Sequence, residues 1–542
     1  MTRPDRTSHD DDARGAHLAD ALRDPAAYPE PGPVEHLETH ISHVFLTGGH
    51  AYKIKKAVNL GFLDFTTLAR RKHFCEEELR INRRLAPDVY LGVVPITGTS
   101  GAPQVEGAGT PIEYAVKMRR FPQESVLDRL ADAGALAPEH IDDIARQLAA
   151  FHDAAAIAPH DADFGTPARI RAVAADNFAP IRARLEDEMA PRLAELQVWT
   201  EHEGVRLAPL MTLRKQQGRI RECHGDLHLG NIALLDGRAV LFDALEFDEA
   251  LRWIDVVNEV SFLAMDLHAH ARSDLAARFV DAWCSHSGDY AGLALLRYYE
   301  VYRALVRAKV AALRATQQPA DGDELRASAR RCTGLVTLAD GLRRPAAPRL
   351  VLLHGVSGSG KTWGAQRMLE ATGAIRIRSD VERKRLSGLD PGGRTDSALD
   401  SGIYAQDFTA RTYAHLAALA RDILRAGFSV LVDATFLRRD RRDAFLRIAG
   451  EEGVPARIAS FVAREEVLRA RVQARQAAAS DASEATLQVL EQQLRTREPL
   501  SPAEQDIAVE FDTSVMSEAC IARRAREMLG DVGASVAPGD DS

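Results

Sequence analysis

At 542 residues, the chain is longer than one hydrophobic core usually supports, so roughly two to four domains are expected. Its 46% hydrophobic and 27% charged residues are typical of a folded globular protein and exclude a disordered or fibrous chain. The formal net charge of −9 argues against non-specific binding to nucleic acids, because such binding needs an excess of Lys and Arg to neutralise phosphates.

The N-terminus has no apolar core of the signal-peptide kind, and no stretch approaches the roughly 18 uninterrupted apolar residues of a membrane helix. We therefore expect a cytoplasmic protein with no membrane partner. The five cysteines are scattered, with neither a C-x-x-C pair nor a histidine spacing that suggests zinc, so reduced and mostly buried thiols are expected.

Residues 1–33 are rich in Asp, Pro and Gly without a sustained hydrophobic period, which predicts a flexible or loosely helical segment. A first domain is predicted over residues 34–341. It opens with the short apolar strands HVFLTGG and AYKIKKAV, a helix from about Thr67 to Leu85, and the strands YLGVVPITGT and IEYAVKMRRF. From Pro138 onward the helical period dominates, so a small sheet lobe should precede a larger helical lobe.

The composition changes at RATQQPADGDE and RRPAAP, which predicts a linker at residues 342–348. A second domain is predicted over residues 349–530, where the apolar strands LVLLHG, SVLVDAT and ARIASFVA alternate with helical segments. This alternation is typical of a parallel sheet with helical crossovers. The polar tail, residues 531–542, is expected to be disordered.

In the first domain, HGDLHLGN places Asp226 five residues before Asn231, and Asp243 follows the apolar strand AVLF twelve residues later. The Asp-to-Asn spacing is that of the protein-kinase catalytic loop. Phosphoryl transfer needs a base to orient the attacking hydroxyl, and oxygen ligands for Mg²⁺. We therefore predict Asp226 as the base, and Asn231 and Asp243 as metal ligands.

This region, about residues 35 to 340, resembles the aminoglycoside phosphotransferase and choline kinase superfamily through H-G-D-x-x-x-x-N, the following strand and its Asp. The resemblance implies an α+β, two-lobed, protein-kinase-like domain. Two features depart from protein kinases: Thr47-Gly48-Gly49 stands in place of G-x-G-x-x-G, and Asp243-Ala244-Leu245 in place of D-F-G. The superfamily often lacks both, so catalysis stays expected, while drug resistance is not implied.

A kinase-like fold binds ATP through a strand lysine that pairs with a Glu of the following helix. AYKIKK offers Lys53 and Lys55 on one face of its strand, because side chains alternate with a period of two. Lys53 is preferred for its A-x-K spacing, and Lys55 is the alternative. Glu78 is the preferred partner over Glu76 and Glu77, although the run also fits an exposed charged helix.

In the second domain, GVSGSGKT matches G-x-x-x-x-G-K-[ST] between the predicted strand Leu350 to Leu353 and a helical stretch, the context that this motif requires. Its backbone N–H groups can surround phosphate oxygens, while the lysine reaches the β and γ phosphates and the threonine hydroxyl can ligate Mg²⁺. The predicted nucleotide-binding residues are Gly355, Val356, Ser357, Gly358, Ser359, Gly360, Lys361 and Thr362.

Two carboxylates end strands near this loop. Asp433 ends SVLVD, where it can hold Mg²⁺ or a metal-bound water, or simply cap the strand end. Asp380 ends AIRIRSD, at the sheet edge where α/β folds bind ligands, and is predicted to accept a proton from an attacking hydroxyl. It can equally cap the helix VERKRL.

This part of the chain resembles the small P-loop kinases of the polynucleotide kinase, gluconate kinase and zeta-toxin type, through GVSGSGKT, S-D-x-x-R and VLVDAT. The resemblance implies an α/β P-loop kinase (AAA-type ATP-binding) domain, in which Asp380 is the base or hydroxyl ligand and Arg383 binds phosphate or substrate. REEVLRARVQAR resembles the lid of these kinases, so Arg471 and Arg475, four apart on one helix face, are expected to close over the phosphoryl group. A solvated face is the alternative.

These features predict a bifunctional phosphotransferase in which each domain uses ATP and Mg²⁺ to phosphorylate a hydroxyl of a small molecule. One alternative is a regulatory protein whose N-terminal domain binds nucleotide without transfer. Another is a C-terminal kinase of nucleic-acid 5′-hydroxyl ends, which the basic cluster at residues 376–385 permits and the net charge of −9 disfavours. Nucleic acid is otherwise not an expected partner, and the sequence predicts neither the acceptors nor an oligomeric state.

Overall fold

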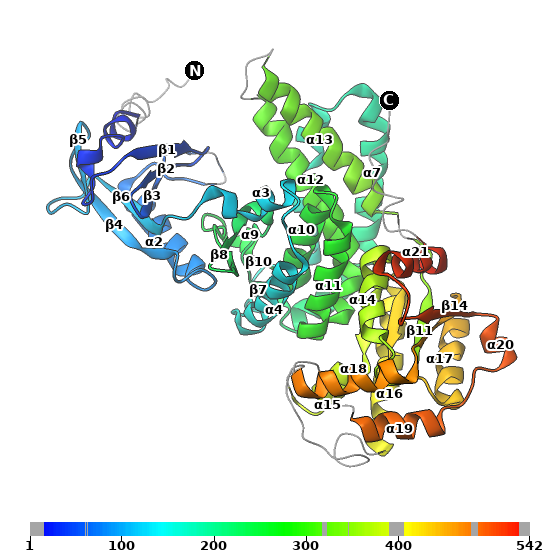
Figure 1. Ribbon diagram of the computed structural model, residues 1–542. Helices are drawn as coiled ribbons and strands as arrows, with labels where there is room; N and C mark the ends of the chain where they lie inside the picture. Colours follow the sequence, from blue (N-terminus) through cyan, green and yellow to red (C-terminus); the bar gives the residue numbers. More distant parts are fainter. Residues whose placement is uncertain are drawn as a thin grey trace. The chain divides into compact units, whose positions relative to one another are not determined.

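The computed structural model describes residues 16–530 except 60, 62, 317–321, 345, 390–405 and 479–485 (Figure 1). The chain divides into two compact units. The first comprises Met1–His140, Ala154–Gly165 and Arg214–Glu259, and the second Ile141–Asp153, Thr166–Leu213 and Val260–Ser542.

A six-stranded antiparallel sheet begins the first unit, in the order β1-β2-β3-β6-β4-β5. Helix α2 (Leu68–Asn82) is capped by Thr67, whose side chain accepts a hydrogen bond from the backbone of Arg70. The predicted hairpin, helix and two further strands are therefore confirmed. The strands are β1 Val34–Glu38, β2 Ser42–Thr47, β3 His50–Lys55, β4 Tyr90–Thr99, β5 Ala102–Val105 and β6 Glu113–Arg119.

The segment predicted to be flexible, residues 1–33, is packed in its second half. Residues 16–21 are helical, and the short helix η1 (Pro25–Ala27) follows. Leu22 and Tyr28 are buried in one cluster with Phe45 of the sheet, because removing apolar surface from water offsets the cost of ordering this segment. The helical alternative thus holds for residues 16–21, and the flexible one is corrected for residues 16–28, while residues 1–15 lie outside the described part.

Short strands hold the segment with the kinase-like motif. Strand β7 (Ile220–Glu222) pairs with β10 (Trp253–Asp255), and β8 (Ile232–Leu235) pairs with β9 (Arg238–Leu241). Residues 224–231 therefore lie between two strand pairs, and η4 (Leu229–Asn231) ends this segment. Asp243 follows β9, as the sequence predicts.

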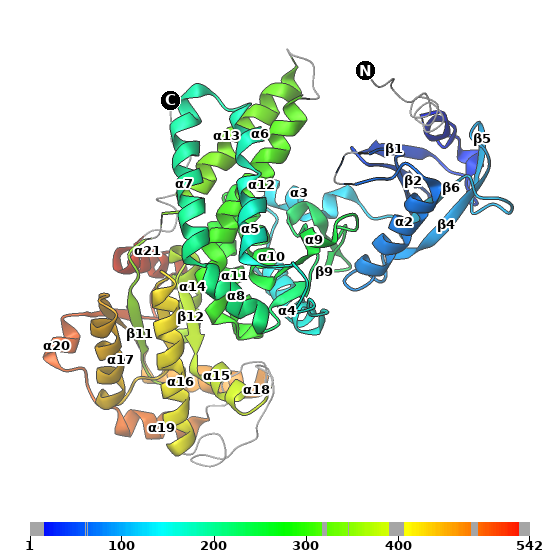
Figure 2. The ribbon, with the colours of Figure 1, turned by 180° about the vertical axis from the view of Figure 1, so that it is seen from behind.

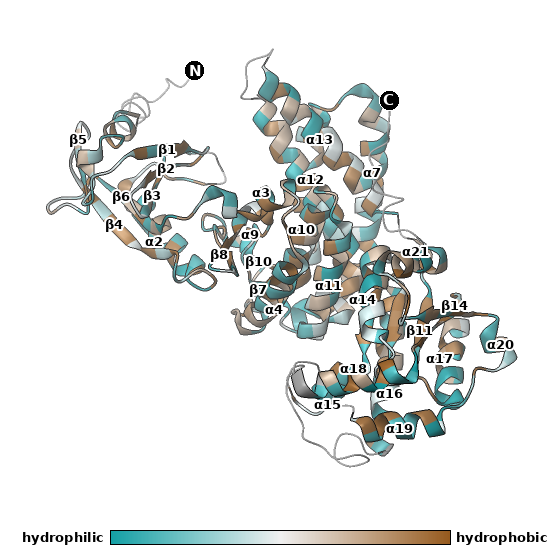
Figure 3. Cartoon of the chain, in the orientation of Figure 1, coloured by the Kyte–Doolittle hydropathy of each residue, from teal (hydrophilic) through white to brown (hydrophobic). Residues whose placement is uncertain are grey.

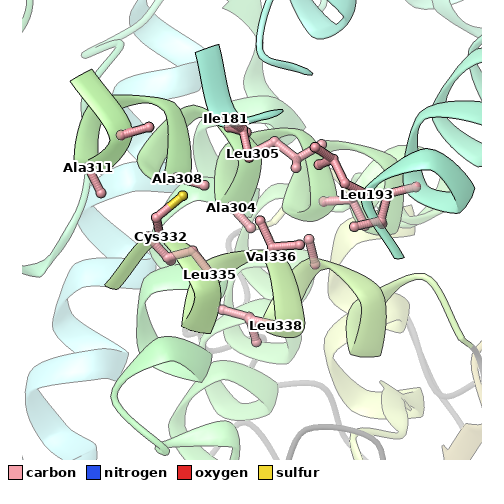
Figure 4. Close-up of a cluster of buried hydrophobic side chains, with 14 of the residues drawn as sticks. Ile181, Leu193, Ala304, Leu305, Ala308, Ala311, Cys332, Leu335, Val336 and Leu338 are labelled. Carbon is pink, nitrogen blue, oxygen red and sulfur yellow. The ribbon is translucent and has the colours of Figure 1, made fainter. Parts of the chain in front are cut away.

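Helices dominate the chain from residue 127 to residue 342. In the second unit, α12 and α13 pack through small side chains such as Ala304 and Ala308 opposite Cys332 and Val336, which allow close approach of the two helices (Figure 4). The helices are α3 Leu127–Asp132, α4 Pro138–Ala154, α5 Pro167–Ala175, α6 Phe178–Arg182, α7 Ala190–Arg206, α8 Ala208–Gln216, α9 Glu249–Arg252, α10 Val256–Ala269, α11 Ser273–Ser287, η5 Tyr290–Gly292, α12 Leu293–Thr316 and α13 Asp323–Leu342.

A five-stranded parallel sheet in the order β12-β13-β11-β14-β15 forms the last part of the second unit. Its central strands are hydrophobic (Figure 3). Helices α14 and α21 cover one face, and α16 and α17 the other (Figures 1 and 2). The strands are β11 Leu350–His354, β12 Ile375–Arg378, β13 Val430–Asp433, β14 Ala456–Val462 and β15 Ala508–Asp512. The helices are α14 Lys361–Thr372, α15 Ser379–Leu386, α16 Gln406–Arg425, α17 Arg439–Glu451, α18 Glu465–Ala478, α19 Leu487–Thr496, α20 Pro502–Gln505 and α21 Glu518–Leu529.

The predicted fold class is confirmed: an α+β kinase-like domain precedes an α/β P-loop domain with a parallel sheet. Within the described residues, no helix combines the length and hydrophobicity that a bilayer span requires. All five cysteines are free thiols and four are buried, as expected. The predicted linker at 342–348 falls between α13 and β11, and the tail at 531–542 lies outside the described residues.

Candidate active sites

The first candidate site is built on the loop after β7. The backbone N–H groups of His224 and Gly225 both donate to one oxygen of Glu259, at 2.6 and 2.8 Å. Asn231 donates through Nδ2 to the carbonyl of Asp226 (2.9 Å) and to its Oδ2 (3.1 Å). Gly225 is needed here, since φ is +87° and a Cβ would lie 2.9 Å from the carbonyl oxygen of Leu251. The carboxylate of Asp226 is thereby held in a fixed position.

Asp243 is brought to the same place by backbone bonds between the two loops. Phe242 N–H donates to the carbonyl of Asn231 (2.9 Å), and Leu245 N–H to that of His224 (3.0 Å). Asp243 itself has a φ of +60°, and its N–H donates to the hydroxyl of Tyr90 (3.1 Å). Its side chain stays 43% exposed, so a carboxylate is available beside Asn231 and fits the oxygen ligands that Mg²⁺ prefers.

The two candidate lysines occupy different positions. Lys53 Nζ lies 2.6 Å from Asp243 Oδ1 and 2.9 Å from Glu78 Oε1. Lys55, whose side chain is fully buried, contacts the other oxygen of Glu78 and also Glu246. The structure therefore brings together Lys53, Glu78 and Asp243, and adds Lys55 with Glu246 as a second, interior pair.

Sequence reasoning missed Glu246, for which the only signal is an acidic residue three positions after Asp243. Burial alone would raise the pKa of Glu78, but the ammonium groups of Lys53 and Lys55 outweigh it and lower that pKa. Burial raises the pKa of Glu246, and the nearby carboxylate of Glu78 adds to this effect, whereas the ammonium groups of Lys55 and Lys53 oppose it.

Lys55→Met should lower the free energy of unfolding by about 3–5 kcal/mol, because removing one partner of a buried ion pair leaves uncompensated charge. Lys53→Met is the matched control: its ammonium is 12% exposed, so it should cost less stability and mainly weaken ATP binding. Denaturant unfolding and ATP titration of both variants separate the roles. Equal losses of stability would contradict the distinction between the two lysines. Weaker ATP binding in a fully stable Lys55→Met protein would mean that the two lysines exchange roles.

The second candidate site is the loop between β11 and α14. Gly355 has a φ of +147°, and a Cβ there would lie 2.5 Å from the carbonyl oxygen of Phe461, so only glycine fits. Lys361 Nζ donates to the carbonyls of Gly355 (2.8 Å) and Val356 (2.9 Å). The Ser359 hydroxyl is buried and, among the described residues, has no hydrogen-bond partner. This loop provides the cradle and the donors that a phosphate group requires.

The carboxylates predicted near this loop are adjacent in the structure. Asp433 Oδ2 accepts a hydrogen bond from Thr362 Oγ1 (3.0 Å), which suits two ligands of one Mg²⁺ ion. Arg378, paired in register with Asp433, donates to Asp380 Oδ2 (3.0 Å). Burial alone would raise the pKa of Asp380, but the Arg378 guanidinium and hydrogen bonds lower it. For Asp433, burial dominates and raises the pKa, although Arg378 opposes it.

The structure also bears on the cap alternative for Asp380. The N-cap of α15 is Arg378, and Asp380 lies in the first turn, where its Oδ1 accepts from the N–H of Val381 (3.0 Å). A carboxylate in the first turn stabilises a helix electrostatically. Asp380 can therefore stabilise α15 and also serve the site.

The arginine predicted to bind phosphate or substrate, Arg383, and the two predicted lid arginines, Arg471 and Arg475, differ in position. Arg383 donates to Thr409 Oγ1 of α16 (3.0 Å). Arg471, on α18, donates to Thr513 Oγ1 (2.7 Å) and to the carbonyl of Gly358 (3.4 Å), so it contacts the phosphate loop. The side chain of Arg475 lies outside the described residues.

A further contact with the loop comes from α19. Gln493 Oε1 accepts from the backbone N–H of Ser357 at 2.7 Å, so a side chain occupies one of the donors that a phosphate would use. Sequence reasoning missed it, because no local signal marks a glutamine 136 positions from its partner.

Two family models match the two parts of the chain that hold these sites. Residues 62–299 match the model of a phosphotransferase enzyme family, and residues 350–500 match that of an AAA domain. Among solved structures, the chain is similar to a choline/ethanolamine kinase family protein from Mesorhizobium loti (14% identity, 60% of this chain and 98% of that one, TM-score 0.37). It is also similar to a gluconokinase from Sinorhizobium meliloti (24% identity, 34% of this chain and 92% of that one, TM-score 0.24).

The two matched domains define an enzyme of the kinase and phosphotransferase class. Uncharacterized proteins of Mycobacterium tuberculosis and Mycobacterium bovis are 33% identical to it over 454 residues, which cover 82% of this chain and 87% of theirs. The chain belongs to the family of these mycobacterial proteins. In this chain, a phosphotransferase-family domain precedes a P-loop domain.

Proposed function

We propose that each domain transfers the γ-phosphoryl group of Mg-ATP to a hydroxyl group of a small molecule. In the phosphotransferase-family domain, the proposal rests on the convergence of Lys53, Asp226, Asn231 and Asp243. The Asp226 carboxylate, 41% exposed and steadied by Asn231, would accept the proton of the attacking hydroxyl. Lys53 would bind the ATP phosphates, and Asn231 with Asp243 would hold Mg²⁺.

In the P-loop domain, the proposal rests on the hydrogen bond between Thr362 and Asp433 beside the loop that Lys361 spans. Lys361 would leave its loop carbonyls to bind the β and γ phosphates, and Thr362 with Asp433 would hold Mg²⁺. Bound Mg²⁺ supplies charge neutralisation between these phosphates. Asp380 would receive the acceptor proton while Arg378 holds its carboxylate in place.

Lys361→Ala should remove one of two ATP-binding events and leave the other unchanged, because the two phosphate sites have unrelated designs. Isothermal titration of wild type and variant with Mg-ATP measures this. Asp226→Asn is the control, since it should keep both events. A single binding event in the wild type would contradict two nucleotide sites. The acceptors can then be sought with γ-labelled ATP against sugars, aminoglycosides, nucleosides and 5′-hydroxyl oligonucleotides.

A further inference from the structure

Strand β12 is an edge of the parallel sheet, and helix α11 lies along it. Both elements belong to the second unit; α11 lies beside α14 in both views (Figures 1 and 2), and β12 is labelled close to them in Figure 2. An edge strand has backbone groups without partners in the sheet. The N–H of Arg376 donates to Asp281 Oδ1 at 2.7 Å, so a carboxylate from α11 completes this edge.

The second oxygen of Asp281 binds the side chain of the same arginine. Arg376 Nη2 donates to Asp281 Oδ2 (2.9 Å) and to Gln366 Oε1 (3.0 Å). Asp281 is 1% exposed and Arg376 is 9% exposed. Charged groups this deeply buried need partners, and Asp281 provides the arginine's only ion pair in the described part of the chain.

The guanidinium group points from Asp281 to the start of α14. Its Nη1 lies 3.4 Å from the carbonyl oxygen of Thr362, the residue whose hydroxyl contacts Asp433. Gln366, one turn further along α14, accepts from the same guanidinium and donates to Glu370 (3.0 Å). Arg376 therefore fixes the first turn of the helix that follows the phosphate loop.

We infer that Asp281, a residue of the phosphotransferase-family domain, is a positioning residue for the nucleotide site of the P-loop domain and acts through Arg376 on the turn that carries Thr362. Asp281 lies within the 62–299 match, whereas Arg376 and Thr362 lie within the 350–500 match. The inference rests on the proposed nucleotide site of the P-loop domain. It means that this site is incomplete without a residue of the other domain.

Other contacts of this helical region reach the P-loop domain without touching the phosphate loop. Arg278, also on α11, binds Asp142 and Glu370 at the far end of α14. Tyr290 of η5 donates to Glu382 Oε1 at 3.2 Å. Both contacts join this helical region to the P-loop domain. Loss of the Tyr290 hydroxyl therefore serves as a control for a general weakening of the packing.

The test compares Asp281→Asn, Arg376→Lys, the double variant and the control Tyr290→Phe in the full chain. Asn keeps an acceptor for the Arg376 N–H but loses the charge, and Lys keeps the charge but cannot hold Gln366 and Thr362 together. Mg-ATP titration should show affinity reduced about tenfold at the site that Lys361→Ala removes, a common size of coupling between linked groups. The double variant should bind Mg-ATP no more weakly than the more affected single variant, because Asp281 and Arg376 act through one contact.

In these variants, the Mg-ATP affinity of the phosphotransferase-family domain should stay unchanged. Tyr290→Phe should keep wild-type Mg-ATP affinity at both sites. An additive double variant, or an equal loss in Tyr290→Phe, would overturn a specific role of Asp281. So would Asp281→Asn and Arg376→Lys proteins that melt at lower temperature yet bind Mg-ATP with wild-type affinity. A wild-type chain with no binding event sensitive to Lys361→Ala would instead overturn the proposed function of the P-loop domain, and this inference with it.

Discussion

Asp226→Asn is expected to reduce phosphoryl transfer by the phosphotransferase-family domain about 10²–10⁴-fold, the usual contribution of a general base. Asparagine keeps the shape of the side chain and can still contact Asn231, but it cannot accept the proton of the attacking hydroxyl. ATP affinity should be nearly unchanged, because Lys53 and Asp243 are untouched. Transfer is measured with γ-labelled ATP in a Lys361→Ala background, which silences the P-loop domain.

Asp243→Asn is the matched variant for this experiment. Its carboxylate faces Lys53 at 2.6 Å and lies beside Asn231, so its loss should weaken Mg-ATP binding rather than only the chemical step. The reverse pattern, with weaker binding in Asp226→Asn and normal binding in Asp243→Asn, would mean that the two carboxylates exchange roles.

Asp380→Ala is expected to reduce phosphoryl transfer by the P-loop domain about 10²–10⁴-fold while slow ATP hydrolysis persists, because hydrolysis needs no aligned acceptor hydroxyl. The experiment uses the full chain in an Asp226→Asn background, so that the other domain contributes little. Asp440→Ala is the control, since Asp440 is likewise a first-turn carboxylate that pairs with a neighbouring arginine, Arg438.

Loss of transfer and hydrolysis to the same extent would return Asp380 to a structural role in the first turn of α15. An Asp440→Ala protein that lost as much activity would show that any first-turn carboxylate matters in this way. Retained transfer in Asp380→Ala would assign the acceptor proton to another group.

The parts of both sites that lie close together in the sequence could be predicted from it. The loop from Gly355 to Thr362, and Asp226 with Asn231, form local segments whose spacing alone determines which side chains meet. Among the strands that were not predicted, β1 and β15 are short and mix charged with apolar residues, so their period is weak.

The pairs that join distant segments could not be predicted. Lys55 and Glu246 lie 191 positions apart, and Arg376 and Asp281 lie 95 apart. One buried lysine or aspartate in a sequence does not show which oppositely charged residue the fold brings to it. Packing decides these partners, so the structure was needed to separate Lys53 from Lys55 and to find Asp281.

The Glu78 carboxylate, which contacts both Lys53 and Lys55, affects which form of the nucleotide the first site would bind. Two ammonium groups, of Lys53 and Lys55, face three carboxylates, of Glu78, Asp243 and Glu246, so one negative charge is uncompensated when all are ionised. Asp243 is the exposed member, and free ATP approaching it would meet stronger like-charge repulsion than the magnesium complex, whose metal ion offsets part of the phosphate charge. Protonation of Glu246, whose pKa burial raises, would remove this excess negative charge. If the domain transfers phosphate as proposed, it should therefore bind Mg-ATP more tightly than free ATP.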